Sequence, residues 1–479
     1  MPFYTLRSMI RVLVEAPRWL LLAALVFAPW AYGSTRPWGI RLLSIGLVLI
    51  TSLWLLECLF RRKRPQVSWL PLSASLGLIA QGWWMAINAK SIFDPQLMIL
   101  FPTKPLTDAL PGSADGLLSS VAMLLITGLL GVFLFTIDLA SRPQWRRRLW
   151  LTMALTGISI AIFGIVQKVG GTPVLAWVWE DAKQDINNNF AMYRYRGNAG
   201  AFLNICLPLA GALAFLAFRR SGNQWGRALW LAGFLIVATG VQLNPSRLSW
   251  CIAMLLLAGF GAHLIYHLWK EMEGSFSFRQ LAGYGVILLF VLGTLASISL
   301  FGGWETSWGR MKQLGVDPSD RSPTEIYVHM VPKAGLLGFG PGTFQVVFPN
   351  YQHSYNFGDR QVPEFWTAHF WPHAHEDYLE YAIEWGWLGA AMWAALIFGG
   401  IILGIRRFLV SREFESRWLL FCSLLGIAGT LLHAFLDFPL QIASIQLYFF
   451  VLLGICCSGK RIEDSEAQRK ATRPETVEG

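Results

Sequence analysis

Residues 371–404 read WPHAHEDYLEYAIEWGWLGAAMWAALIFGGIILG and combine two kinds of sequence. The first seven residues contain two histidines and two carboxylates, and the remainder is apolar except for two glutamates near its start. A run of about 20 apolar residues is long enough to cross a bilayer as a helix. The stretch therefore predicts a membrane-spanning helix that begins directly after a polar segment.

Runs of similar length recur on both sides of this stretch. Hydrophobic residues make up 54% of the chain and charged residues 14%, whereas a typical globular domain is roughly 25% charged. This composition excludes a soluble enzyme and predicts an all-α, polytopic bundle of about twelve transmembrane helices. The predicted spans are residues 18–34, 40–60, 68–87, 117–140, 149–167, 199–218, 228–243, 248–268, 281–301, 378–404, 418–436 and 440–457.

The longest interruption between spans is the polar segment 302–377. It separates a first block, residues 1–301 with spans one to nine, from a second block, residues 378–457 with spans ten to twelve. Residues 458–479 are polar and charged, and we expect a disordered tail. A loop as long as 302–377 is usually either functional or disordered. Its aromatic residues and turn signals argue against disorder, so we expect this large loop to carry the chemistry.

The formal charge of +10 is concentrated in basic clusters between the apolar runs. The positive-inside rule assigns such clusters to the cytoplasmic side of a membrane. The charge is therefore an orientation signal rather than a sign of a nucleic-acid partner. It predicts that both termini are cytoplasmic and that the large loop faces outward, together with two smaller loops, 88–116 and 168–198.

Two local patterns predict structure inside the large loop. Ser322-Pro-Thr-Glu325 resembles a capping box with proline at the first helical position, and it predicts a short helix that Pro332 stops. The glycines of Gly338-Phe-Gly-Pro-Gly342 disfavour both helix and strand, so this segment predicts a turn.

Arg247 is the most informative single charge in the predicted membrane region. It lies in Asn244-Pro-Ser-Arg247, a tight outward turn that opens the span 248–268. A cation there opposes the positive-inside bias and sits at the positive end of a helix dipole. One interpretation is an interfacial arginine that reaches water or pairs with a carboxylate. The other is an arginine that grips an anionic group, because its planar fork of donors suits a phosphate.

The densest cluster of titratable residues in the large loop contains His369, His373, His375 and Glu376, and three interpretations are open. One is a metal site, although the His-Glu-x-x-His pattern fails at Leu379 and the six cysteines all lie in apolar runs. In the second, the carboxylates only cap the following helix and the histidines are interfacial polar residues. In the third, His375 is a catalytic group, because histidine is suited to proton transfer near neutral pH.

Five short elements follow one another between residues 194 and 457. They are Asn244-Pro-Ser-Arg247, Arg310-Met-Lys-Gln-Leu314, Gly338-Phe-Gly-Pro-Gly-Thr-Phe344, His375-Glu376 with Gly386 and Gly389, and His433-Ala-Phe-Leu-Asp437-Phe-Pro-Leu-Gln441. In their order and membrane placement they resemble the O-antigen ligase/polymerase superfamily of bacterial membrane glycan transferases. Members of that family have a long outward loop late in a bundle of membrane helices, as predicted here.

The resemblance implies transfer of a glycan from an undecaprenyl-pyrophosphate carrier to a hydroxyl of a glycan or lipid-core acceptor. The reaction would take place at the outer face of the bacterial cytoplasmic membrane, with either ligase or polymerase activity. Arg247, Arg310 and Arg321 are expected to stabilise charge on the leaving pyrophosphate. His375 is expected to take the proton of the acceptor hydroxyl. Because arginines can neutralise the phosphates, we expect neither a metal nor another cofactor.

Further substrate contacts are expected from the segments around these residues. They are Arg194, Arg196, Gly340, Gly342, Glu376, Asp377 and His433. Glu376 departs from the family pattern, in which asparagine, serine or glutamine commonly follows the histidine. We expect this carboxylate to lie beside His375 and to stabilise its protonated form.

Two other functional classes compete with a transferase. A lipid-linked glycan transporter or flippase would need polar residues near the bilayer midplane. Here Glu57 and Asp138 lie near the cytoplasmic ends of their spans, and Glu380 and Glu384 near the outer end of theirs. A non-catalytic membrane scaffold would leave Arg247 and the histidine cluster unexplained. The sequence therefore favours chemistry at the membrane surface.

Overall fold

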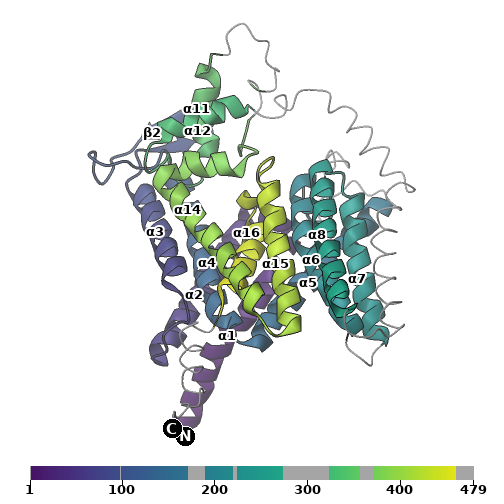
Figure 1. Cartoon of the computed structure of the whole chain (residues 1–479). Helices are drawn as coiled ribbons and strands as arrows, with labels where there is room; N and C mark the ends of the chain where they lie inside the picture. Colours follow the sequence, from purple (N-terminus) through teal and green to yellow (C-terminus); the bar gives the residue numbers. More distant parts are fainter. Residues whose placement is uncertain are drawn as a thin grey trace, which may run out of the picture.

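The computed structural model describes residues 2–97, 99–170, 189–219, 224–272, 323–356, 366 and 370–459. Within these ranges the chain is a bundle of helices (Figure 1), and ten of them are long and apolar enough to cross a membrane. The all-α, membrane-protein class predicted from composition is therefore confirmed.

The helices of span length follow one another through most of the described chain. They are α1 (Pro2–Trp30), α2 (Pro37–Phe60), α3 (Trp69–Ile87), α4 (Gly116–Ala140), α5 (Pro143–Val169), α6 (Arg196–Arg219), α7 (Gln224–Leu243), α8 (Arg247–Met272), α14 (Asp377–Val410) and α15 (Phe414–His433). A shorter apolar helix, α16 (Ala443–Cys457), follows. Each predicted span except 281–301 overlaps one of these helices. Residues 281–301 lie outside the described residues, so a count of twelve stays a prediction.

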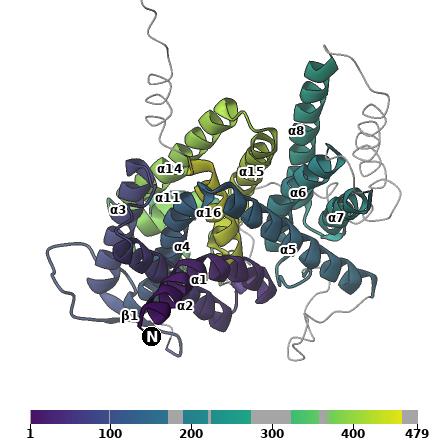
Figure 2. The same cartoon turned by 90° about the horizontal axis from the view of Figure 1, so that it is seen from below.

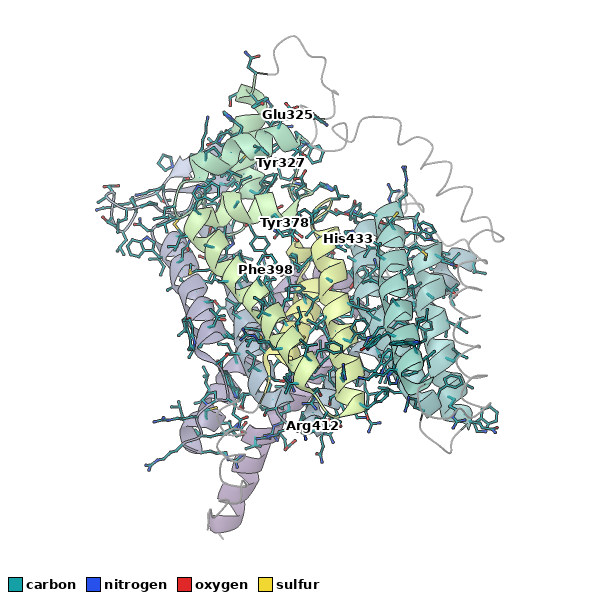
Figure 3. The ribbon with its side chains drawn as sticks, viewed as in Figure 1. Glu325, Tyr327, Tyr378, Phe398, Arg412 and His433 are labelled. Carbon is teal, nitrogen blue, oxygen red and sulfur yellow. The ribbon has the colours of Figure 1, made fainter. Side chains whose placement is uncertain are left out.

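The two ends of the bundle differ in character. Figure 3 places Tyr378 and His433 toward one end and Arg412 at the other, where α1 begins. The clusters Arg61–Arg64, Arg146–Arg148 and Arg406–Arg407 belong to the ends of helices that meet on the Arg412 side. We call this side the basic end, and the opposite side, where the remaining short helices lie, the loop end.

Helix α6 is the most enclosed of the long helices. In the apolar stretch of α6, 89% of the helix is buried inside the bundle. The helix packs against α5, α7, α8 and α15. Figure 2, viewed from the basic end, shows α6, α7 and α8 grouped on one side and α16 between α4 and α15. Helices in a membrane rely on small residues for close packing. A Cβ added at Gly200 of α6 would lie 1.9 Å from Ser249 Oγ of α8, so the starts of these two helices are in direct contact.

A small domain covers the loop end above α3, α4 and α14 (Figure 1). It contains the antiparallel hairpin of β1 (Ser91–Asp94) and β2 (Ile99–Pro102), together with α11 (Thr324–Ala334) and α12 (Phe344–Ser354). We call it the loop domain. It has an apolar core separate from that of the bundle, formed mainly by Ile326, Tyr327, Met330, Phe344, Phe348, Trp366 and Trp371, with Ile383 of α14.

The short helix predicted inside the large loop exists as α11, but its ends differ from the prediction. Pro323 precedes the first helical residue, as the N-cap, and Ser322 lies outside the described residues. Pro332 does not stop the helix. It lies in the last turn, and the helix ends two residues later, before Gly335 at φ +63°.

The predicted glycine turn is confirmed between α11 and α12. Gly338, Gly340 and Gly342 have φ values of +82°, +110° and +74°, which side chains rarely tolerate. Space is also short, because a Cβ at Gly338 would lie 2.1 Å from the carbonyl oxygen of Glu384 on α14. The turn can therefore press its backbone directly against α14.

A kink in α14 at Gly386 exchanges helix hydrogen bonds for bonds to the segment 335–340. In an unbroken helix, the amides at 387 and 388 would donate to the carbonyls at 383 and 384. The observed bonds are instead Trp387 N to Gly335 O (3.1 Å), Leu388 N to Leu336 O (3.0 Å), Phe339 N to Ile383 O (3.0 Å) and Gly340 N to Glu384 O (2.9 Å). Each of these four backbone groups of α14 therefore has a hydrogen-bond partner, and the four bonds tie the loop domain to α14.

Candidate functional site

A histidine–carboxylate pair lies at the loop end where α14 starts and α15 ends. The Nδ1 atom of His375 is 3.3 Å from Oδ1 of Asp437. The His375 side chain is 30% exposed and that of Asp437 only 6%. The histidine can therefore meet a ligand while its carboxylate partner is shielded from water.

Asp437 collects hydrogen bonds from several directions. Its Oδ2 atom accepts from the Tyr195 hydroxyl at 3.1 Å and lies 3.5 Å from Nε2 of His433. The backbone N–H of Phe438 donates to Oδ1 at 3.0 Å. Burial alone would raise the pKa of Asp437, but the hydrogen bonds and charge of His375 and His433 outweigh burial and hold that pKa well below its ordinary value. The carboxyl is therefore an ionised, fixed partner for His375.

Aromatic rings enclose His375. The His375 ring stands nearly perpendicular to Phe438, Trp371 and Tyr195, with centroid distances of 4.6, 5.6 and 6.1 Å. Tyr195 is itself stacked on Phe438 at 5.4 Å. These contacts limit how the imidazole can turn, and Nε2 is the ring nitrogen without a partner in the part of the chain that the structure describes.

The backbone of His375 is held in an uncommon conformation. Its φ is +50°, a region that costs a non-glycine residue on the order of 1–3 kcal/mol. Asp377, the first residue of α14, makes two hydrogen bonds that fix this segment against the loop after α15. Its amide donates to Ala434 O at 3.0 Å, and its Oδ2 atom accepts from the Leu440 amide at 2.8 Å. This pinning aims the His375 side chain at Asp437.

The starts of α6 and α8 reach the same place. A Cβ added at Gly197 would lie 2.3 Å from Oδ2 of Asp437, so the first turn of α6 touches the carboxylate. The Asn244 side chain donates to Arg196 O at 2.9 Å and joins the turn before α8 to α6. Arg196 and Arg247 are the first residues of these helices, and both are half-buried. The positive end of α6 therefore lies beside the pair, and the start of α8 is joined to it, an arrangement suited to an anion.

The other residues predicted to contact substrate have diverse positions. Arg194 is exposed just before α6, whereas Asp377 and His433 are only 0% and 1% exposed. Asp377 accepts a hydrogen bond from the Leu440 amide, and His433 lies 3.5 Å from Asp437. Gly340 and Gly342 lie away from His375, in the glycine turn, against Ser113 and Ala122 of the segment that starts α4. Arg310 and Arg321 lie outside the described residues.

Glu376 does not pair with His375, contrary to the sequence-based expectation. Its Oε1 atom accepts from the Thr324 hydroxyl at 2.5 Å, at the first residue of α11. Burial raises the pKa of the Glu376 carboxyl, and the bond from Thr324 offsets this only in part. The carboxylate that faces His375 is Asp437, which is distant in sequence, so adjacency along the chain gave the wrong partner.

A second histidine–carboxylate pair was missed from the sequence. The Nδ1 atom of His373 lies 2.9 Å from Oε1 of Glu380, whose Oε2 accepts from the Ala374 amide at 2.7 Å. Burial alone would lower the pKa of His373, but the charge and hydrogen bond of Glu380 outweigh it and raise the pKa above its ordinary value. The available signal was Glu380 itself, because a carboxylate inside an apolar run needs a partner.

His369 lies outside the described residues, so the metal interpretation of the three histidines stays a hypothesis. Among the residues that are described, no group of three or more His, Cys, Asp or Glu side chains could hold a metal ion. Neither protein-family models nor curated proteins gave a match to this chain. The functional assignment therefore depends on the geometry and on the sequence elements described above.

Proposed function

We propose that the protein is a membrane glycan transferase. It would move a saccharide from a polyprenyl-pyrophosphate carrier to a hydroxyl group of an acceptor sugar. The observation that carries the proposal is the His375–Asp437 pair, placed at the loop end beside the arginine-bearing starts of α6 and α8. This combination offers a base and an anion site at the depth where a lipid-linked pyrophosphate would lie.

The proposed step is a single displacement. The acceptor hydroxyl oxygen attacks the anomeric carbon of the donor sugar, and the bond from that carbon to the phosphate oxygen breaks. Nε2 of His375 takes the hydroxyl proton, while Nδ1–H donates to Asp437 and the carboxylate stabilises the imidazolium that forms. General-base help of this kind contributes about 10²–10⁴-fold.

The electron pair of the broken bond stays on the pyrophosphate, which leaves with increased negative charge. Arg196, Arg247 and the amides at the starts of α6 and α8 would stabilise that charge. Arg310, which lies in an element that resembles the family, and Arg321, another arginine of the large loop, are added to this role from the sequence alone. Loss of one preorganised donor costs about 10²–10³-fold in comparable sites.

The placement of charged side chains supports chemistry at the surface rather than transport through the bundle. Among the described long helices, Glu57 and Asp138 pair with Arg18, Arg61 and Lys63 near the basic end. Glu380 and Glu384 lie in the first turns of α14 at the loop end. We therefore assign the loop end to the outer face and the basic end to the cytoplasm of a bacterial inner membrane.

The proposal is tested by reconstituting the purified protein in liposomes that contain an undecaprenyl-pyrophosphate-linked oligosaccharide. Two acceptors are offered separately: a lipid-anchored core saccharide and a second copy of the lipid-linked oligosaccharide. Transfer to the first indicates a ligase, and chain growth on the second indicates a polymerase. We expect undecaprenyl pyrophosphate to be released with one of the two acceptors. The rate of release should be the same with and without EDTA. The proposal fails if neither arm yields product while the protein remains folded.

A further inference from the structure

His373 and His375 are held in the same way by different carboxylates. In each, Nδ1 meets a carboxyl that is nearly inaccessible to water, since the side chains of Glu380 and Asp437 are 1% and 6% exposed. In each, the imidazole is about one-third exposed, and Nε2 has no partner among the described residues. Each of the two fixed imidazoles therefore has its Nε2 atom available to a ligand.

The two imidazoles share one aromatic neighbour. His373 is stacked on the Phe438 ring at a centroid distance of 4.9 Å, and His375 meets the same ring at 4.6 Å. Phe438 follows Asp437 directly in the chain and donates its amide to that carboxylate. The two imidazoles are therefore neighbours around one phenyl ring.

The surroundings of the two histidines differ in charge. Asp437, which holds His375, is in contact with the first turn of α6, and α6 and α8 begin with arginines. Glu380, which holds His373, is followed one turn later by Glu384, which accepts from the Phe344 amide at the start of α12. The site thus has an arginine side toward α6 and α8 and a carboxyl side toward the loop domain.

The carboxyl side suits a phosphate less well than the arginine side, because the charge of a protonated His373 is already balanced by the buried Glu380 carboxylate. The ionisable groups that act on His373 from the described chain are Glu380, Glu384 and Asp437, all of them carboxyls. A second anion placed there would meet like charge or a poorly compensated polar group. A neutral hydroxyl would meet neither, because the imidazole N–H can donate to its oxygen.

We propose that the His373–Glu380 pair is an acceptor-binding site that takes a neutral sugar, with Nε2–H of His373 donating to a ring hydroxyl. The inference rests on the proposed transferase function and assigns the two substrates to opposite sides of the site. Donor pyrophosphate lies on the arginine side, and acceptor sugar lies between His373 and His375. Acceptors with a phosphate or carboxylate on the reacting sugar are therefore disfavoured.

Two substitutions separate the two ring nitrogens. In His373→Asn, the amide nitrogen can replace Nδ1 and keep the bond to Glu380, but nothing replaces Nε2. In His373→Gln, the longer side chain can bring an amide nitrogen close to the Nε2 position. The matched control is His353→Ala, which removes an exposed histidine from α12 in the same loop domain.

The experiment measures KM for donor and acceptor separately, with a lipid-anchored neutral hexose disaccharide and its 6-phosphate as acceptors. Loss of one hydrogen bond is expected to raise the acceptor KM of His373→Asn about three- to tenfold and to leave the donor KM unchanged. His373→Gln should recover part of the loss, and His353→Ala should match wild type. In wild type, the 6-phosphate should be the poorer acceptor.

Two results would overturn the inference: a rise in the donor KM alone, or an unchanged acceptor KM in His373→Asn. Preference of wild type for the 6-phosphate would contradict the assignment of a neutral sugar. Absence of transfer by wild type would instead remove the proposed function itself. Because wild type is assayed beside the variants, the two failures are distinguishable.

Discussion

At the scale of single residues, the central feature is that His375 is paired with a carboxylate more than 60 positions away in sequence. The pair combines an accessible imidazole with Asp437, which is buried and multiply hydrogen-bonded. Burial alone would raise the pKa of Asp437, but the hydrogen bonds and charge of His375 and His433 hold it below its ordinary value. Asp437 is therefore an ionised, fixed partner that orients the ring of the proposed base.

Asp437→Asn tests this role in kcat. The amide keeps the size of the side chain but removes the charge that stabilises the imidazolium formed when His375 takes the proton. We expect kcat to fall, because both this stabilisation and the orientation of the ring are weakened. Glu376→Gln is the matched control, because Glu376 bonds to Thr324 rather than to His375.

The expected outcome is a lowered kcat in Asp437→Asn and an unchanged kcat in Glu376→Gln. The reverse result would return the role of charge partner to Glu376. The dependence of folding stability on pH should also differ between wild type and Asp437→Asn. Because the pKa of Asp437 is depressed in the folded protein, its contribution is present above the ordinary aspartate value near about 3.9 and is lost as the pH falls toward the folded-state value. Wild type should therefore lose more of its stability on acidification than Asp437→Asn.

At the scale of elements, the junction between α14 and the loop domain depends on paired glycines. Gly386 (φ +63°, ψ −172°) and Gly335 (φ +63°, ψ −151°) occupy the same backbone region. They differ in the room available for a side chain. A Cβ at Gly386 would lie 2.4 Å from the Gly338 amide nitrogen, whereas nothing lies within 4 Å of a Cβ at Gly335. The two positions therefore separate backbone strain from steric conflict.

Gly335→Ala should cost only backbone strain, about 1–3 kcal/mol. Gly386→Ala should carry the same strain and also force apart the four hydrogen bonds at the junction, so it should cost at least about 1 kcal/mol more. Thermal unfolding of both variants in detergent measures the difference. Increased protease cleavage within the loop domain should accompany Gly386→Ala alone. Equal destabilisation by the two variants would show that the junction does not bear on stability.

At the scale of the whole molecule, the alternation of helix direction and the basic end predict the topology. Reporter fusions after Asn356, in the loop domain, should report an outward location. Fusions after Arg412, which Figure 3 places at the basic end, should report a cytoplasmic one. Swapped signals would invert the orientation and would place the proposed site on the wrong side for an exported glycan.

The sequence predicted the fold class well because bilayer thickness and hydropathy determine spans almost locally. The glycine turn at 338–342 was also predictable, since glycine spacing there excludes helix and strand. Partners across the fold were not. Asp437 reaches His375 through tertiary packing, whereas Glu380 follows His373 by seven residues and was overlooked as its partner. Pro332 was tolerated because it falls in the last helical turn. The hairpin of β1 and β2 was likewise missed, because two four-residue strands leave little pattern.

The central claim is that His375 and Asp437 act together as the proton acceptor in glycan transfer. The most direct measurement is the single-turnover rate of transfer from an undecaprenyl-pyrophosphate-linked oligosaccharide by wild type, His375→Ala, Asp437→Asn and the double variant. His375→Ala should be slower by about 10²–10⁴-fold, and the double variant should be no slower than His375→Ala, because residues that act as a unit are not additive. A rate of His375→Ala within about threefold of wild type, where a general base contributes at least about 10²-fold, would contradict the account.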